Sequence, residues 1–308
     1  MELPQAGVYT ASLTPLFDSF EPNIPALIRH AQWLLEEGSD GVALLGSTGE
    51  SNSMTVEQRQ SIIEQSALEL PPDRLMMGTG SCALQDAVRL TQASVNAGVL
   101  SVLVLPPFYY PQSEESVLSF FSLLVEAVDN PNLRIIFYNF PQLSGYNFSI
   151  KILQELKLRF GDIAAGIKDS SGDWNNMLDM VQNVPDLMVY TGTETLLLDI
   201  LRKGGAGSIT ATANLIAPEC QHVFQAWKNG RSEAADQAQK HLTALRIAFE
   251  SYSFVSEMKS LLAAQTNSEE WNHMLPPFAQ LPDEQVEELT EQIKVLGLDL
   301  SQRLLLKS

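Results

Sequence analysis

Cysteine is scarce in this 308-residue chain. The two cysteines, Cys82 and Cys220, lie far apart and form no CxxC pair, so neither a disulfide framework nor a zinc ribbon is supported. The four histidines lack the i, i+4 spacing of a helical metal site. They are His30, His222, His241 and His273. We therefore expect no metal and no other cofactor.

Positive charge and long apolar runs are lacking as well. The chain has 19 Lys and Arg against 37 Asp and Glu, a formal net charge of −18. Such an acidic surface repels phosphate backbones and anionic lipids, which disfavours nucleic-acid and membrane partners. No segment offers about 18 uninterrupted apolar residues, and the N-terminus lacks a basic start followed by an apolar stretch. We therefore expect a cytoplasmic location.

What the chain does contain is a regular alternation of two kinds of segment. Short apolar runs occur at 7–13, 41–46, 75–78, 101–105, 134–138, 163–168, 187–191 and 206–210. Between them, apolar residues recur at helical spacing, most clearly over 24–35, 56–70, 84–97 and 117–128. Continuously apolar strands that alternate with helices indicate parallel βαβ units. Eight such units predict an α/β fold, a closed (β/α)8 TIM barrel.

The remainder of the chain has no convincing strand. From about residue 226, helical spacing is found over 234–249, 255–264 and 284–296, with Pro276-Pro277 breaking the chain before the last of these. We therefore predict two domains. Residues 1–225 form the barrel that carries the active site, and residues 226–308 form a C-terminal helical extension.

Lys168 ends the sixth apolar run, where an apolar residue is expected. Side chains alternate along a strand, so we expect Ala164 and Gly166 to share its face and to leave space for a ligand. Burial disfavours the ammonium form and makes a lysine nucleophilic enough to form a Schiff base with a carbonyl compound. The alternative is a lysine at a strand end that reaches water or pairs with Asp169.

Polar residues follow other strands at the end where a barrel builds its site. The second run leads into Gly46-Ser47-Thr48-Gly49-Glu50, whose hydroxyl and N–H groups can hold a carboxylate or phosphate. A tight turn with a helix cap is the alternative. The fifth run ends at Tyr138, level with Lys168, where a phenol can relay protons. Its alternative is a core tyrosine with a satisfied hydroxyl.

Two further loops complete the predicted site. The fourth run leads into the aromatic loop 106–111, which can wall a pocket or pack against another subunit. The seventh leads into Thr191-Gly192-Thr193-Glu194, groups suited to binding a polyol or orienting water. A lysine, a tyrosine and a hydroxyl-rich loop fit an aldolase that acts on an α-keto acid. A protonated imine stabilises the neighbouring carbanion without a metal.

Four segments in order carry a family resemblance: 46–50, 138–141, 166–169 and 205–214. Together the chain resembles the dihydrodipicolinate synthase and N-acetylneuraminate lyase family of class I Schiff-base aldolases. The resemblance implies a barrel with a C-terminal helical domain, assembled as a homotetramer that is a dimer of dimers. It also implies a pyruvate-like 2-oxo acid as the substrate.

The resemblance also implies roles for single residues. Lys168 is similar to the Schiff-base lysine and Tyr138 to the proton-shuttling tyrosine. Ser47 and Thr48 resemble the residues that bind the keto-acid carboxylate, and Ser47 also links to the tyrosine relay. The relay tyrosine contributed by a neighbouring subunit aligns best with Tyr109, and adjacent Tyr110 is the alternative. The resemblance also implies that Glu194 contacts the variable end of the substrate and that the backbone carbonyl of Ile209 faces the keto acid. Gly192, in the loop after the seventh run, is the remaining predicted substrate-binding residue.

The choice of reaction depends on Leu143. Dihydrodipicolinate synthases usually carry an arginine two residues after the proline of their Tyr-Asn-x-Pro motif, and here Leu143 follows Pro141 at that spacing. An aspartate-semialdehyde carboxylate would lack its cation there. We therefore expect a lyase that forms or cleaves a carbon–carbon bond in a 2-oxo acid derived from a sugar acid. The alternatives are a true dihydrodipicolinate synthase that uses Arg134 or another cation, and a non-catalytic keto-acid-binding barrel.

Overall fold

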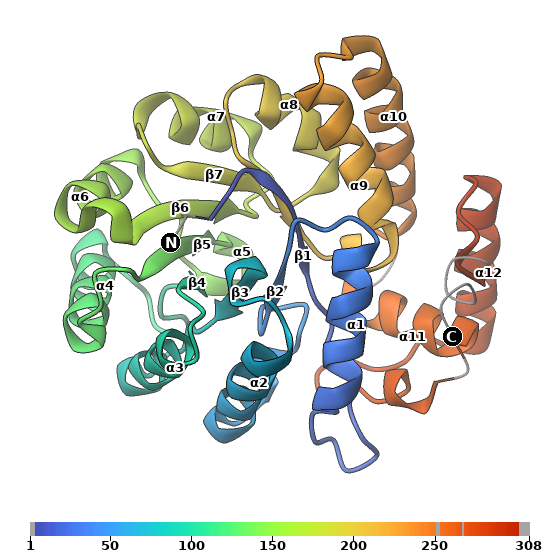
Figure 1. Cartoon of the computed structure of the whole chain (residues 1–308), viewed down its shortest axis with the longest axis horizontal. Coiled ribbons are helices and arrows are strands. Elements are labelled where there is room, and N and C mark those ends of the chain that lie inside the picture. Colours follow the sequence, from blue (N-terminus) through green and yellow to red (C-terminus); the bar gives the residue numbers. More distant parts are fainter. Residues whose placement is uncertain (1–3, 251–252, 267, 302–308) are drawn as a thin grey trace.

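A computed structural model describes residues 4–250, 253–266 and 268–301. Eight parallel strands follow one another in chain order and close into a barrel, as the sequence predicts (Figure 1). Each is short and buried almost throughout, which is why it appears in the sequence as a continuous apolar run. The strands are β1 Gly7–Ala11, β2 Gly41–Leu44, β3 Leu75–Gly78, β4 Ser101–Val104, β5 Arg134–Asn139, β6 Ala164–Asp169, β7 Met188–Thr191 and β8 Gly207–Thr210.

Helices surround the barrel and cover its outer face (Figure 1). The helix predicted over 117–128 begins three residues earlier, because the Ser113 hydroxyl accepts a hydrogen bond from the Ser116 N–H at 3.2 Å and caps it. The helices up to residue 228 are α1 Ile24–Glu36, α2 Val56–Glu69, α3 Leu84–Asn96, α4 Glu114–Val128, α5 Pro141–Ser144, α6 Ile150–Phe160, α7 Trp174–Asn183, α8 Leu197–Arg202 and α9 Ala213–Lys228.

Three helices follow the barrel, as predicted: α10 Ser232–Ala248, α11 Phe254–Thr266 and α12 Asp283–Val295. In Figure 1, α10 lies beside α9, and α12 lies next to α11 at the edge of the molecule. One buried apolar cluster includes Phe224 of α9, Leu245 of α10, Met258 of α11 and Ile293 of α12. The division of the chain at residue 225 stays a prediction, and that residue lies inside α9. None of the helices in the described ranges is long and apolar enough to cross a membrane.

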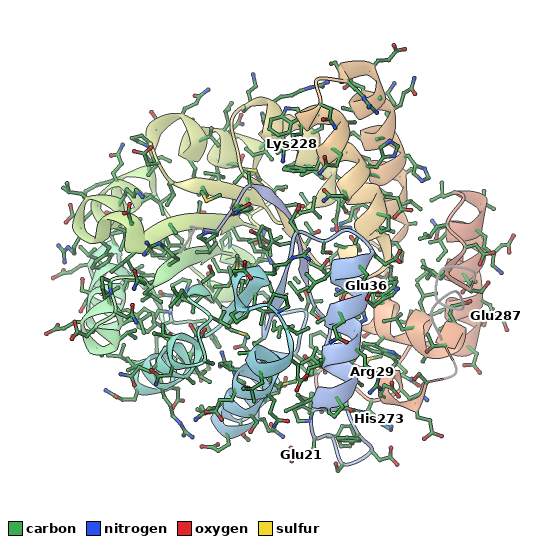
Figure 2. The ribbon with its side chains drawn as sticks, in the orientation of Figure 1. Glu21, Arg29, Glu36, Lys228, His273 and Glu287 are labelled. Atoms are coloured by element: carbon green, nitrogen blue, oxygen red, sulfur yellow. The ribbon has the colours of Figure 1, made fainter. Side chains whose placement is uncertain are left out.

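The C-terminal segment also contacts the start of α1. Arg29 lies 3.6 Å from Glu270, and His273 Nε2 lies 3.1 Å from the Asp18 carboxylate. Figure 2 shows Arg29 and His273 near each other where this segment meets α1. Because α1 follows the carboxyl end of β1, these contacts bring the segment to the end of the barrel where a site is expected.

The predicted alternation along β6 is wrong for Ala164 and Ala165. Ala164 packs with Ile167 in the cluster between the barrel and its outer helices, whereas Ala165 packs inside the barrel with Tyr138. The register between β5 and β6 shifts at this point, from Ile135 opposite Ala164 to Ile136 opposite Gly166. One extra residue at such a bulge exchanges the faces of the residues before it.

His30 on α1 is buried, and its Nε2 lies 2.8 Å from Asn214 Oδ1. The Asn214 amide nitrogen donates to two backbone carbonyls, so its oxygen is the acceptor and the neutral imidazole donates through Nε2. Burial lowers the pKa of His30 to about 4. The folded protein therefore holds this ring neutral over a range in which the unfolded chain protonates it.

We expect the free energy of unfolding to fall by about 2 kcal/mol between pH 7 and pH 5 through His30 alone. Stability is lost as the pH falls below 6.5, because the unfolded chain then binds a proton at His30 that the folded protein does not bind. His30→Gln keeps a donor and removes the titration, and urea unfolding at both pH values measures the difference. Exposed His222→Gln is the matched control. An unchanged pH dependence in His30→Gln would contradict the prediction.

Candidate active site

A cavity of about 590 Å³ opens at the carboxyl ends of the strands. Its walls come from the segments that follow β2, β5, β6, β7 and β8, and from residues of the C-terminal helices. A TIM barrel builds its sites at this end, and the volume suits a small organic molecule. Six of the eight predicted site residues line it: Ser47, Thr48, Tyr138, Lys168, Gly192 and Glu194.

Lys168 lies in the wall of this cavity and is only 5% exposed. It sits opposite Tyr138 in the β5–β6 register, and its Nζ lies 4.3 Å from the centroid of that ring. Within the described ranges, no ion pair joins Lys168 to Asp169. The alternative in which Lys168 pairs with Asp169 is therefore wrong, and the 5% exposure of Lys168 argues against a side chain that extends into bulk water.

Asp169 instead forms hydrogen bonds that stabilise the ends of two neighbouring strands. Its carboxylate accepts hydrogen bonds from Asn139 Nδ2 at 2.7 Å and from the N–H and hydroxyl of Ser171. Burial raises the pKa of Asp169, and these donors oppose the rise. Asn139 also accepts from the Phe148 N–H at 3.1 Å. These contacts hold the ends of β5 and β6 together, which fixes Tyr138 relative to Lys168.

Ser47 and Thr48 stand in a tight loop after β2. The Glu50 N–H donates to the Ser47 carbonyl at 3.2 Å, and the Thr14 hydroxyl donates to the Gly49 carbonyl at 3.0 Å. The helix-cap alternative is wrong for these two residues, because Thr55 caps the next α-helix. No hydrogen bond within the described ranges joins Ser47 to Tyr138, so their link stays a prediction.

Glu50, the last residue of this loop, is paired with Lys259 of α11. Both side chains are 0% exposed, and Lys259 Nζ lies 2.5 Å from Glu50 Oε1. Lys259 also donates to the His273 carbonyl, and Glu50 Oε2 accepts from the Leu275 N–H at 2.6 Å. Burial lowers the pKa of Lys259, and the Glu50 carboxylate opposes that effect. Lys259 could not be predicted from the sequence, since 209 residues separate it from Glu50.

The cavity contains a second charged group, which we call the Arg246 cluster: Glu194, Thr212, Arg246 and Glu250. The buried Glu194 carboxylate lies 3.0 Å from Arg246 Nε and accepts a hydrogen bond from the Thr212 hydroxyl. Arg246 Nη1 donates to Glu250 at 2.9 Å. Arg246 could not be predicted as a site residue, because an arginine in an amphipathic helix has the pattern of a surface residue.

Gly192 is at a position where a side chain would not fit. A Cβ built on it would lie 2.1 Å from the Ser170 hydroxyl oxygen. Its N–H donates to the Asp169 carbonyl at 2.8 Å. Gly192 lines the cavity where the segments after β6 and β7 approach closely, and its role in substrate binding stays a prediction.

Two predicted site residues do not line the cavity. Tyr109 is 86% exposed, with a positive φ of 83°, and its ring packs edge-on against Tyr110. Ile209 is buried in the barrel interior. A relay tyrosine supplied by a neighbouring subunit requires an exposed residue, so the predicted role of Tyr109 is untested by a single chain.

Leu143 and Arg134, the two residues on which the synthase alternative depends, lie at different places in the barrel. Leu143 lines the cavity, where the expected arginine is absent. Arg134 is the first residue of β5, roughly 13 Å along the strand from Tyr138, and it donates to the Pro131 and Leu133 carbonyls. The alternative in which Arg134 replaces the missing arginine is therefore wrong.

No group of three or more His, Cys, Asp or Glu side chains within the described ranges is placed to hold a metal ion. The polar groups that converge in the cavity are an amine, a phenol, hydroxyls and the Arg246 cluster. Such a set can form an imine, move protons and bind oxygen-rich groups.

Comparison with known proteins gives consistent matches. The model of the dihydrodipicolinate synthetase family matches residues 4–296. An uncharacterized DapA-like lyase of Chloroflexus aurantiacus is 34% identical over 242 residues, which covers 78% of this chain and 80% of that one. A 4-hydroxy-tetrahydrodipicolinate synthase of Methanococcoides burtonii is 28% identical over 94% of this chain and 98% of its own length.

Solved structures agree in fold. The prophage protein YagE of E. coli K12, solved in complex with pyruvate, has a TM-score of 0.88 at 24% identity and covers 96% of this chain and 99% of its own. The dihydrodipicolinate synthase of Agrobacterium tumefaciens has a TM-score of 0.85 at 26% identity, with 95% and 99% covered. The barrel and its C-terminal helices are therefore shared along nearly the whole chain.

Proposed function

Since the chain belongs to the dihydrodipicolinate synthetase family, a family of lyases, we propose that Lys168 forms a Schiff base with pyruvate or a related 2-oxo acid. The observation that carries the proposal is the buried Lys168 amine, which stands in the cavity wall over the Tyr138 ring. The amine nitrogen attacks the keto carbon, and water leaves as the imine forms. The pyruvate found with YagE supports this class of substrate.

The protonated imine then makes carbon–carbon cleavage accessible. In the proposed scheme Tyr138 gives its phenolic proton to the hydroxyl group that leaves as water when the imine forms. In a 4-hydroxy-2-oxo acid, the Tyr138 oxygen then takes the proton of the 4-hydroxyl group, the bond between carbons 3 and 4 breaks, and its electrons move toward the imine nitrogen. An aldehyde leaves, Tyr138 passes the proton it has taken to carbon 3 of the enamine, and water then releases pyruvate from the amine. Ser47 and Thr48 bind the carboxylate next to the imine in this scheme, with hydroxyl and loop N–H donors.

We propose a sugar-acid-derived 2-oxo acid as the substrate. Leu143 offers no charge to a semialdehyde carboxylate, and Arg134 is at the other end of β5. Among the described lining residues the cations are Lys168 and Arg246, and Arg246 already contacts two carboxylates. Several relatives are named 4-hydroxy-tetrahydrodipicolinate synthase, so condensation of pyruvate with aspartate semialdehyde is the second candidate.

The proposed assembly and location follow the same family. We propose a cytoplasmic homotetramer in which the exposed Tyr109 of one subunit reaches the site of its neighbour and completes the proton relay. The exposed pair of tyrosine rings gives an apolar, hydrogen-bonding surface of the kind enriched at protein interfaces.

Trapping with borohydride tests the proposed function. We expect the intact mass of the wild-type protein to increase by one reduced pyruvyl group per chain after incubation with pyruvate and sodium borohydride. Peptide mapping is expected to place the adduct on Lys168. A non-catalytic keto-acid-binding barrel would bind pyruvate without forming an adduct. Turnover of aspartate semialdehyde with pyruvate, compared with cleavage of sugar-derived 2-oxo acids, separates the two enzyme candidates.

A further inference from the structure

The Arg246 cluster lines the same cavity as Lys168 but comes from other parts of the chain. Glu194 follows β7 and Thr212 follows β8. Arg246 lies in the last turn of α10, and Glu250 lies just after that helix. The Arg246 side chain is 10% exposed, and its guanidinium lies 4.3 Å from the centroid of the Phe254 ring. Contacts with Glu194, Glu250 and Phe254 therefore fix the direction in which the Arg246 N–H groups point in the cavity wall.

The charges of the cluster do not balance. One guanidinium faces two carboxylates, Glu194 at 3.0 Å and Glu250 at 2.9 Å. Thr212 donates to Glu194, and the hydroxyl groups of Thr193 and Thr195 lie 3.0 Å apart on the same wall. A substrate carboxylate here would meet Glu194 and Glu250 without a cation of its own, at an unfavourable electrostatic cost.

Neutral hydroxyl groups fit the cluster much better. Each hydroxyl both donates and accepts, so it can accept from an Arg246 N–H and donate to a Glu250 oxygen. Glu250 is 51% exposed and can shift to admit a ligand, whereas Glu194 is fully enclosed and holds Arg246 in place.

We propose that Arg246 and Glu250 form a specificity site for the uncharged, hydroxylated tail of the substrate, and that they select against a tail that ends in a carboxylate. This inference rests on the proposed function, since it assumes that the carbonyl end of the same molecule is held on Lys168. It assigns substrate selection to the C-terminal helices, while the barrel supplies the chemistry.

Two substrates of equal carbon number test the proposal. Both are 3-deoxy-2-oxo acids with a 4-hydroxyl group, and one ends in a primary alcohol while the other ends in a carboxylate. We expect the wild-type kcat/KM to favour the alcohol by about tenfold or more, given the effect of one charge-assisted hydrogen bond. Glu250→Gln is expected to narrow this preference mainly by improving the acid-ended substrate, because one repelling charge is removed.

Arg246→Lys is the second variant, because lysine keeps the charge beside Glu194 but loses the planar arrangement of donors. We expect kcat/KM for the alcohol-ended substrate to fall by about tenfold to a hundredfold, with pyruvate trapping on Lys168 unchanged. Glu233→Gln, an exposed glutamate on the same helix, is the control and should change neither substrate.

The outcomes separate the two proposals. If the wild-type protein is not trapped by pyruvate, the proposed function is wrong. If trapping succeeds but the wild type prefers the acid-ended substrate, or if Glu250→Gln leaves the preference unchanged, the specificity site is wrong while the Schiff-base chemistry stands. Because Glu250 is half-exposed, its variant is expected to fold even if Arg246→Lys does not.

Discussion

Replacing Lys168 with alanine is expected to reduce turnover of the physiological 2-oxo acid by roughly four orders of magnitude or more, the scale seen when a covalent nucleophile is removed. The imine is the electron sink of the proposed reaction, and no other described lysine lines the cavity to replace it. Steady-state kinetics on the purified variant, with borohydride trapping in parallel, measure the effect.

The matched control is Lys151→Ala, which removes an 85% exposed lysine from α6. We expect this control to keep wild-type turnover and the wild-type adduct. Lys168→Ala is expected to remain folded, because the lost side chain borders a cavity and makes no ion pair within the described ranges. If Lys168→Ala were trapped by pyruvate as efficiently as the wild type, the assignment of the imine to this lysine would be refuted.

Much of the fold could be predicted because parallel strands are buried on both faces. Residues 101–105 and 187–191 are recognisable without any knowledge of their neighbours, since a continuous apolar run needs no partner to be seen. The face of Ala164 could not be predicted in this way. It depends on one residue inserted relative to β5, a property of the paired strands and not of β6 alone.

Some residues of the candidate site could be predicted from the sequence around them, whereas others depend on contacts with distant parts of the chain. Lys168 and Tyr138 were predictable because a polar residue at the end of an apolar strand is conspicuous and the order of the strands places both at the same end. Arg246 and Lys259 lie on amphipathic helices, where a charged residue every few positions is ordinary. Their roles come from contacts with Glu194 and Glu50, which lie far away in the sequence.

Replacing Lys259 with methionine is expected to lower the free energy of unfolding by about 3 to 5 kcal/mol, the usual cost of leaving one partner of a buried ion pair without its counter-charge. Glu50 would then be a buried carboxylate that keeps only the Leu275 N–H among the contacts described above. Urea unfolding at pH 7 measures the change, and Lys151→Ala again serves as the exposed control.

The double variant Glu50→Gln with Lys259→Met separates charge from packing. Glutamine removes the uncompensated charge and retains an oxygen that can accept from the Leu275 N–H, so the double variant is expected to be more stable than Lys259→Met alone. Glu50 ends the loop that carries Ser47 and Thr48, and the ion pair ties this loop to α11. We therefore expect both variants to raise the KM for the 2-oxo acid more than they lower kcat. If Lys259→Met were as stable as the wild type, or if the double variant were less stable than Lys259→Met, the buried pair would not be the contact that holds the loop.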